Sequence, residues 1–282
     1  MALLSLGGRP PGDPPHGGLP PPIPPGWELS IRAFRCWLTE YRRLWRSSVW
    51  SSFLGPVFYL GALGYGLGSL VDKHGTASLG GVPYVKFVAP AILAFQAMNS
   101  GMSNAAFPVY SAVHWSRIYI AARATQLRAA DIFRGHAMFM VLRVAMNSAC
   151  FIVVMAAFGT IRSPWGAALL PAAVLTGFAF AAPVAAWAVT LEKETPMNYV
   201  FRFVGVPMML FSGTFYPVSR LPGWLQPLAY ATPLWHGAAL CRGFSLGIVD
   251  PGSVALHVSY LAVIGGAGLW AGARTYRRRL YV

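Results

Sequence analysis

The chain has few charged residues for its length. Only 11% of its 282 residues are Asp, Glu, Lys or Arg, whereas a soluble globular domain carries about 25%. Hydrophobic residues make up 56% of the chain, and the mean hydropathy is +0.51. This balance excludes an ordinary soluble domain and predicts a polytopic membrane protein.

Acidic residues are the scarcer of the two charge types. The chain has eight acids against 22 Lys and Arg. We expect all eight to lie in a terminal tail, a surface helix or loops, and none within the apolar stretches. Proton-coupled transport usually requires carboxylates inside the spans. A membrane-bound lipid or glycan transferase, the alternative function, requires acids, histidines or metal ligands gathered at one membrane face. Neither pattern is present.

Lysine is scarcer still, with only Lys73, Lys86 and Lys193 in the chain. A phosphate-binding P-loop needs a lysine after a spaced pair of glycines, and none of the three follows such a pattern. The chain is therefore not expected to bind ATP in this way, and we expect no cofactor or catalytic residue in it. It is either a passive channel or one subunit of a machine that another polypeptide powers.

The three cysteines, Cys36, Cys150 and Cys241, are odd in number and far apart. This spacing supports neither a disulfide framework nor a zinc site. The net charge of +14 favours anionic lipid rather than nucleic acid as the partner, because the basic residues lie between apolar segments.

The N-terminal 46 residues divide into two parts. Residues 1–26 hold nine of the 23 prolines, and we expect a disordered cytoplasmic tail. The apolar run at the start is too short for a signal peptide. Residues 27–46 combine apolar positions at helical spacing with five arginines, which is typical of an amphipathic helix lying in the membrane interface. The alternative is the charged flank of the next span.

Six apolar stretches reach the length of roughly 20 residues that crosses a bilayer. They cover residues 49–71, 84–109, 136–159, 166–191, 198–216 and 252–272. With the N-terminus in the cytoplasm, the inside loops hold 14 basic residues and the outside loops five. This asymmetry predicts that both termini are cytoplasmic. The expected domains are the tail 1–26, the interfacial helix 27–46, a six-span domain 47–272 and a basic cytoplasmic tail 273–282.

The stretch after the fifth span is apolar but rich in proline. It includes Phe211-Ser-Gly-Thr-Phe-Tyr-Pro217, Leu221-Pro222 and Thr232-Pro-Leu-Trp-His236. No single straight helix can contain so many prolines. We expect short helical pieces that turn back at the outer membrane face as a re-entrant segment packed on protein. We expect His236 to be a hydrogen-bonded structural residue, with no other histidine or carboxylate at ligand spacing.

This stretch resembles the C-terminal motif of ABC type-2 permeases, the membrane subunits of ABC exporters. The branch it is most similar to contains the nodulation lipo-oligosaccharide and daunorubicin-type drug-resistance exporters. The resemblance covers residues 27–282. It implies an all-α membrane protein with six transmembrane helices, an N-terminal interfacial helix and an outer re-entrant broken helix. The residues matching the motif are Ser212, Gly213, Pro217, Leu221, Pro222, Pro233 and His236.

The resemblance also implies a function and partners. It implies a permease subunit that moves a glycolipid, lipo-oligosaccharide or hydrophobic drug outward, with ATP and magnesium bound by a separate ABC ATPase. The loop between the second and third spans would then carry a coupling helix that docks on the ATPase. The alternative is a solvated basic loop near lipid headgroups. The expected docking residues are Trp115, Arg117, Ile118, Arg123, Gln126 and Arg128.

Six spans are few for enclosing a path for a lipid-linked cargo. We therefore expect a second permease chain, identical or homologous, with the glycine-rich first span and the fifth span as the seam. Polar residues inside the second and third spans are the candidates for lining the path: Gln96, Asn99, Asn104, Arg143 and Asn147. An ATPase-docking regulatory protein is the further alternative, and it would need no such residues.

Overall fold

The computed structural model describes residues 25–73 and 81–280. Helices joined by turns account for the described residues, and no strand occurs among them. The all-α expectation is confirmed. The expected disordered tail, residues 1–26, lies outside the described residues except for its last two positions.

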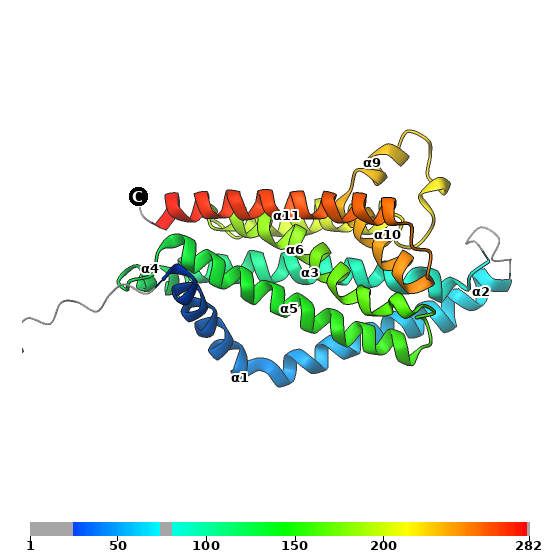
Figure 1. The fold of residues 1–282 in the computed structure, drawn as a ribbon, viewed down its shortest axis with the longest axis horizontal. Coiled ribbons are helices and arrows are strands. Elements are labelled where there is room, and N and C mark those ends of the chain that lie inside the picture. Colours follow the sequence, from blue (N-terminus) through cyan, green and yellow to red (C-terminus); the bar gives the residue numbers. More distant parts are fainter. Residues whose placement is uncertain (1–24, 74–80, 281–282) are drawn as a thin grey trace, which may run out of the picture.

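The expected interfacial helix and the first expected span are parts of one continuous helix. Helix α1 (Gly26–Gly61) contains the expected interfacial helix and continues into the first span, bending midway (Figure 1). The π-helical turn η1 (Ala62–Leu67) and α2 (Gly68–Lys73) complete that span. Pro56, inside α1, has no backbone N–H to donate, and the glycines that follow accommodate the irregular turn.

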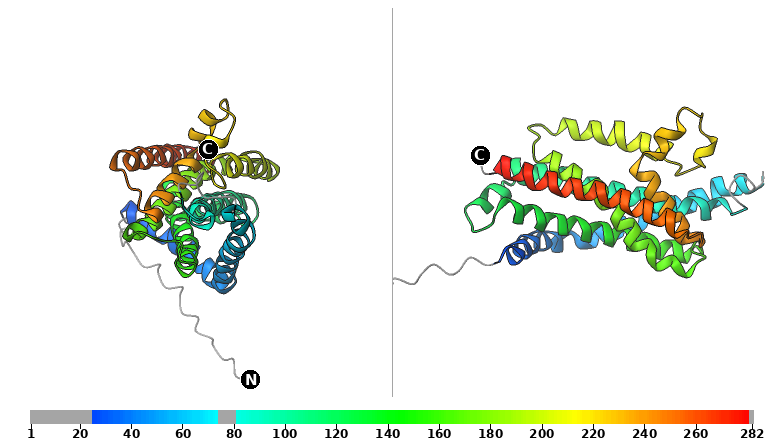
Figure 2. Two further views of the ribbon diagram at one scale, coloured as in Figure 1. Left: turned by 90° about the vertical axis from the view of Figure 1, so that its right-hand side faces the viewer. Right: turned by 45° about the horizontal axis from the view of Figure 1, so that its top comes forward.

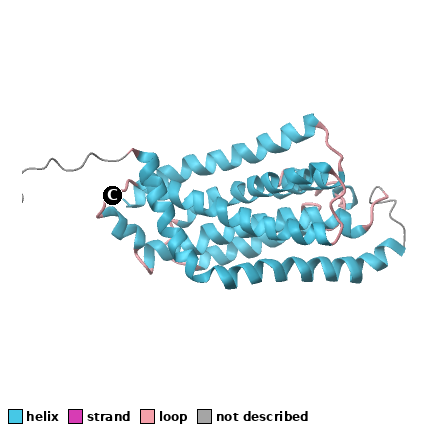
Figure 3. Ribbon diagram, turned by 60° about the horizontal axis from the view of Figure 1, so that its bottom comes forward, coloured by secondary structure: helices cyan, strands magenta, loops and turns pink. Residues whose placement is uncertain are grey.

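Four long helices form the body of the molecule. They are α3 (Tyr84–His114), α5 (Ala129–Ala157), α6 (Leu169–Ala188) and α11 (Pro251–Leu280), and they run side by side along the long axis (Figures 1 and 3). A 3-10 turn, η3 (Pro164–Ala168), precedes α6. The short helix α4 (Ile118–Arg123) lies at the same end as the C-terminus, and the tip of α2 lies at the opposite end.

Helix α6 is the central helix of the bundle and packs against α3, α5, α10 and α11. Alanine supplies much of its buried surface, which lets neighbouring backbones approach closely. At the crossing of α3 and α6, Gly101 and Gly177 face each other. A Cβ added at Gly177 would lie 2.7 Å from the carbonyl oxygen of Ala97 and 2.6 Å from Cγ1 of Val144.

The fifth predicted span is a helix with a π-helical centre. It comprises α7 (Thr195–Val200), η4 (Phe201–Gly205) and α8 (Val206–Phe211) without a break. Figure 2 shows it standing apart from α11 at the edge of the bundle. Its start packs on α3, where the rings of Phe107 and Phe201 stack with centroids 5.9 Å apart. Beyond that point Phe203 is 72% exposed.

The proline-rich stretch forms three short helices. These are the 3-10 turn η5 (Val218–Arg220), α9 (Gln226–Tyr230) and α10 (Pro233–Leu246). Each of the two α-helices has a proline in its first turn, where the missing N–H has no intrahelical partner anyway. Helix α10 packs against α3, α6 and α11. The expectation of broken helices is therefore confirmed, while the re-entrant path in a membrane stays a prediction.

Four helices are long and apolar enough to cross a membrane within the described part of the chain: Ser48–Lys73, Ala129–Ala157, Pro164–Ala188 and Pro251–Leu280. They coincide with the expected first, third, fourth and sixth spans. The expected second span lies within α3, and the expected fifth span, residues 198–216, overlaps the helix at residues 195–211 but extends past its end. The count of six spans stays a prediction. The basic residues placed in the expected tail, residues 273–282, belong to the last turns of α11 up to Leu280.

Candidate functional site

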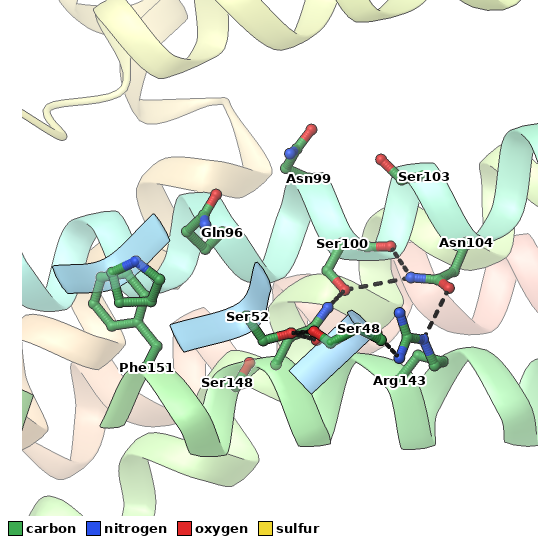
Figure 4. A pocket seen from close by; sticks show the side chains of 12 residues that line it. Ser48, Ser52, Gln96, Asn99, Ser100, Ser103, Asn104, Arg143, Ser148 and Phe151 are labelled. Carbon is green, nitrogen blue, oxygen red and sulfur yellow. Dashed lines mark hydrogen bonds between the residues drawn. The ribbon is translucent and has the colours of Figure 1, made fainter. Parts of the chain in front are cut away.

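Polar side chains from three helices surround one cavity at mid-height of the bundle. The cavity has a volume of about 320 Å³ and lies between α1, α3 and α5 (Figure 4). Most of the residues lining it carry a hydroxyl or amide group, one is cationic, and none is a carboxylate: Ser48, Ser52, Pro56, Gln96, Asn99, Ser100, Ser103, Asn104, Arg143, Asn147, Ser148 and Phe151. We call this cavity the polar chamber.

Arg143 is the charged residue of the polar chamber. Its Nη1 donates to Ser48 Oγ at 2.7 Å, and its Nε donates to Asn104 Oδ1 at 3.4 Å. The guanidinium also lies 4.4 Å from the centre of the Tyr41 ring. An arginine at the centre of a membrane helix costs about 2.5–3.5 kcal/mol on insertion scales. The hydroxyl, amide and ring contacts offset part of that cost.

Next to Arg143, a network of hydrogen bonds joins helices α1, α3 and α5. Asn147 Nδ2 of α5 donates to Ser100 Oγ of α3 at 2.8 Å, and Ser52 Oγ of α1 donates to Asn147 Oδ1 at 2.8 Å. Asn104 Nδ2 donates to the Ser100 carbonyl at 2.8 Å. Ser148 Oγ is buried and has no hydrogen-bond partner among the described residues. The chamber wall thus keeps a hydroxyl group unpaired.

All five residues expected to line a path are found at the polar chamber, although lining a path stays a prediction. Ser100 and Asn104 face α5, while Asn99 and Ser103 project from the other side of α3 (Figure 4). Sequence reasoning missed the serines. The signal for them was the four-residue spacing of Ser48 with Ser52 and of Ser100 with Asn104, which places each pair on one helix face.

The expected docking helix is shorter than predicted. The sequence suggested a helix over Trp115 to Arg128, but α4 covers only Ile118–Arg123. Trp115 is the C-cap residue of α3. Arg117 has a left-handed φ of 52°, so the chain changes direction there and a new helix, α4, begins after it. Gln126 lies in the following turn, and Arg128 is the N-cap residue of α5.

Helix α4 is tied to the polar chamber through two hydrogen bonds. Tyr119 Oη lies 2.5 Å from His136 Nδ1, and His136 Nε2 lies 3.2 Å from the carbonyl oxygen of Asn104. Since a carbonyl only accepts, Nε2 carries the proton and Nδ1 accepts from the tyrosine. Trp37 of α1 stacks on the His136 ring at 4.3 Å. We call Tyr119, His136 and Asn104 the relay.

Two acids expected in loops lie within helices instead, Asp72 in α2 and Asp131 in α5. Asp131 falls in the expected loop between the second and third spans, but α5 begins at Ala129 and Asp131 is only 2% exposed. Its Oδ2 accepts from the Arg128 backbone N–H at 3.3 Å, and its Oδ1 accepts from Ser30 Oγ at 3.4 Å. Asp131 therefore caps α5 and attaches it to α1.

The motif residues after α8 lie at the end of the bundle opposite α4. Ser212 is buried, with its Oγ 3.1 Å from Thr214 Oγ1, and Gly213 has a φ of 76° that favours glycine. The Gly213 carbonyl accepts from Arg242 Nη2 at 3.0 Å, while Arg242 Nε donates to the Phe87 carbonyl at 3.1 Å. Arg242 thus joins α10 to α3 and to the turn.

The remaining motif residues shape the turns between η5 and α10. Leu221 is buried, and its carbonyl accepts from Gln226 Nε2 at 2.9 Å. Pro217 precedes η5 and Pro222 follows it. Pro233 is the first residue of α10, whose N-cap Thr232 accepts from the Trp235 N–H at 3.3 Å.

His236 is hydrogen-bonded, as expected, and its partner is a histidine far away in the sequence. His236 Nδ1 lies 2.8 Å from His257 Nδ1 of α11, and the Tyr260 ring stacks on His236 at 3.9 Å. The two histidines are 21 positions apart in the chain, and only the packing of α10 on α11 brings them together. Within residues 25–73 and 81–280, no group of three or more His, Cys, Asp or Glu residues is arranged to hold a metal ion.

Comparison with known proteins identifies the family. The model of the ABC-2 type transporter family matches residues 32–244. The chain belongs to this family. An ABC-2 type transporter of this composition is a multi-pass membrane protein, in agreement with its long apolar helices.

Relatives of this ABC-2 type transporter include several rhizobial proteins named nodulation protein J. The one from Sinorhizobium fredii is 31% identical over 255 residues, which cover 86% of this chain and 94% of that protein. The one from Rhizobium leguminosarum bv. trifolii is 32% identical with the same coverage. The one from Rhizobium meliloti is 28% identical over 90% of this chain and 99% of that protein.

Proposed function

We propose that this chain is the permease subunit of an ABC exporter that moves an amphipathic or lipid-linked molecule outward. A separate ABC ATPase supplies the work and binds the ATP and magnesium. The family assignment supports a transporter membrane subunit. The cargo class follows from the resemblance to exporters of glycolipids, lipo-oligosaccharides and hydrophobic drugs.

The polar chamber is the observation that carries this proposal. It places hydroxyl and amide groups and one arginine at mid-height of helices that are otherwise apolar. Such groups are unfavourable against lipid and are normally turned to protein or to a water-filled path. Asn99 is exposed and projects from α3 away from α5, so that face requires a neighbour other than lipid tails.

A second permease chain completes the path in this proposal. The first and fifth predicted spans expose large apolar side chains, including Phe58 and Phe203. Both spans also contain a π-helical turn, a distortion found frequently at functional sites. A pair of chains joined along these spans would enclose two polar chambers.

The ATPase docks at the end that holds α4. Trp115 is 62% exposed there, beside a groove of about 260 Å³ that Trp37, Phe107 and Ile118 also line. The basic residues at the end of α11 lie at the same end, which the charge asymmetry assigns to the cytoplasm. Movement of the docked ATPase would then tilt α3 and α5, which flank the chamber.

The test is to purify this chain together with a candidate ABC ATPase and to measure ATP hydrolysis in the reconstituted complex. We expect a stable complex whose hydrolysis is uncoupled or lost when Trp115→Glu and Arg117→Glu are introduced. The matched control is Trp165→Glu, which places a charge on an exposed tryptophan at the opposite end. A chain that purifies alone and recruits no ATPase would contradict the proposal.

A further inference from the structure

We propose that the polar chamber binds an anionic phosphate-type group, with Arg143 as its ligand. The inference rests on the proposed function, since it names the chemistry that the path recognises. A phosphate-type group reaches the chamber either as part of a lipid headgroup or as part of a water-soluble ester.

The charge of the chamber is uncompensated. Arg143 makes no ion pair among residues 25–73 and 81–280, and no carboxylate lines the cavity. The guanidinium group of an arginine is a delocalised cation. Helix α5 therefore holds a permanent positive charge beside an open cavity, and an anion would remove the imbalance.

The hydrogen-bonding groups of the chamber are those that an oxyanion requires. Arg143 uses one N–H on Ser48 and one on Asn104, and its fork carries further donors. Ser148 Oγ is buried, lines the chamber and donates to no described residue. A phosphate oxygen accepts from both kinds of donor, and a planar guanidinium pairs with phosphate in a bidentate manner.

Two other roles for Arg143, reaching for the membrane surface and serving only as a structural residue, explain its position and contacts less well. A residue that reaches for the membrane surface would lie near a helix end, but Arg143 is near the middle of α5 (Ala129–Ala157) and points into the chamber (Figure 4). A purely structural arginine would have its charge matched by an acid from a neighbouring helix. Asp131, the buried acid of α5, is engaged instead with Ser30 and the Arg128 backbone.

The experiment is a binding titration by calorimetry with the purified chain in phosphatidylcholine nanodiscs. The probes are dioctanoyl phosphatidic acid, dioctanoyl glycerol with the same tails but no phosphate, and inorganic phosphate. We expect the wild type to bind phosphatidic acid in preference to the glycerol. We expect Arg143→Gln to weaken that binding about tenfold or more, and Ser148→Ala to weaken it less.

Arg143→Lys keeps the positive charge but lacks the planar fork of guanidinium donors. Its affinity for phosphatidic acid should lie between those of the wild type and Arg143→Gln. This variant separates charge from folding, because Arg143→Gln also alters the contacts with Ser48 and Asn104. The matched control is Arg202→Gln, which removes a positive charge from an exposed position outside the chamber, and its affinity should equal that of the wild type.

The outcomes distinguish the sources of the anion and the two proposals. Arg143-dependent binding of phosphatidic acid alone supports a lipid headgroup, and binding of inorganic phosphate as well supports a soluble ester. Equal binding of phosphatidic acid and dioctanoyl glycerol, or unchanged binding in Arg143→Gln, overturns the anion site. If Arg143 binds the anion but Arg143→Gln exports cargo normally in the complex with the ATPase, the anion site stands and the path role of the chamber fails.

Discussion

His236 is held in its neutral form by its neighbours. The side chain is buried between α10 and α11, stacked on Tyr260 and hydrogen-bonded to His257. Burial and, to a smaller extent, the adjacent His257 together lower the pKa of His236 to about 4. Protonation of His236 would place a positive charge in this buried site.

We expect the stability of the chain to fall as the pH falls from about 6.5 to about 4. Because the folded-state pKa of His236 lies below its value of 6.5 in an unfolded chain, the unfolded state binds the proton more readily. The stabilisation is complete above pH 6.5 and is lost as the pH approaches 4. Thermal unfolding of the detergent-solubilised chain, followed over this range, measures the effect.

The matched variant for this prediction is His236→Gln, which hydrogen-bonds but does not titrate. Its unfolding temperature should depend less on pH between 6.5 and 4 than that of the wild type. His16, which lies outside the described residues, is replaced by Gln as a second control and should leave the pH dependence unchanged. Identical pH profiles for the wild type and His236→Gln would rule out this role for the histidine pair.

The crossing of α3 and α6 depends on two glycines. A Cβ at Gly101 would overlap the carbonyl group of Gly177, and a Cβ at Gly177 would press on the Ala97 carbonyl and on Val144. The obstacles are largely backbone atoms, which have little freedom to move. We therefore expect Gly177→Ala to destabilise the fold by about 1–3 kcal/mol, the usual cost of overpacking a core.

Thermal or denaturant unfolding of Gly177→Ala measures this cost. The control is Gly205→Ala in η4, where an added Cβ meets nothing within 4 Å. That variant should be as stable as the wild type or slightly more stable, since alanine favours helix over glycine. Equal destabilisation of the two variants would mean that close packing at this crossing is not the cause.

The relay gives α4 a direct connection to the polar chamber. Tyr119 is hydrogen-bonded to His136, and His136 is hydrogen-bonded to the backbone carbonyl of Asn104. The side chain of Asn104 in turn accepts a hydrogen bond from Arg143. If α4 transmits the movement of the ATPase, this chain of contacts would carry it to the chamber. We expect Tyr119→Phe to lower transport per ATP about fivefold, equivalent to the roughly 1 kcal/mol of one hydrogen bond.

Transport and ATP hydrolysis by the reconstituted complex are measured together in this experiment. Tyr216→Phe is the control, because Tyr216 lies at the opposite end beside η5. Its transport per ATP should match that of the wild type. A Tyr119→Phe variant with unchanged transport per ATP would show that the relay is structural.

At the scale of the whole molecule, the orientation in the membrane is open to a labelling test. Thr125, in the turn after α4, is assigned to the cytoplasm, and Trp224, which is 79% exposed, is assigned to the outer face. In a chain without native cysteines, Trp224→Cys should react with a membrane-impermeant maleimide in intact cells. Thr125→Cys should react only after the membrane is permeabilised, and the reverse pattern would invert the topology.

The assembly of two chains predicts a specific pattern of crosslinks. Single cysteines at Phe58 in the first span and Phe203 in the fifth should form dimers with a short bifunctional reagent. Val263 of α11 is similarly exposed but lies outside the expected seam, so a cysteine at this position should not form crosslinked dimers. Crosslinks confined to Val263 would exclude the seam that we propose.

Much of the architecture was predictable from local patterns. Apolar stretches of spanning length matched helices in the structure, and the prolines interrupt the chain as expected, with Pro222 following η5 and Pro233 beginning α10. These are consequences of backbone chemistry within a few residues. The extent of α4 was not predictable, because Arg117 adopts a left-handed conformation that its residue type does not indicate.

The sequence by itself determined that this is an all-helical membrane protein without a P-loop motif, because neither composition nor a sequence motif depends on packing. It also marked Arg143 and Asn147 as polar residues inside a span. Only the tertiary structure decided that Ser48, Ser100 and Asn147 share one chamber and that His236 meets His257. Such contacts join residues far apart in the chain, and helix packing rather than local pattern brings them together.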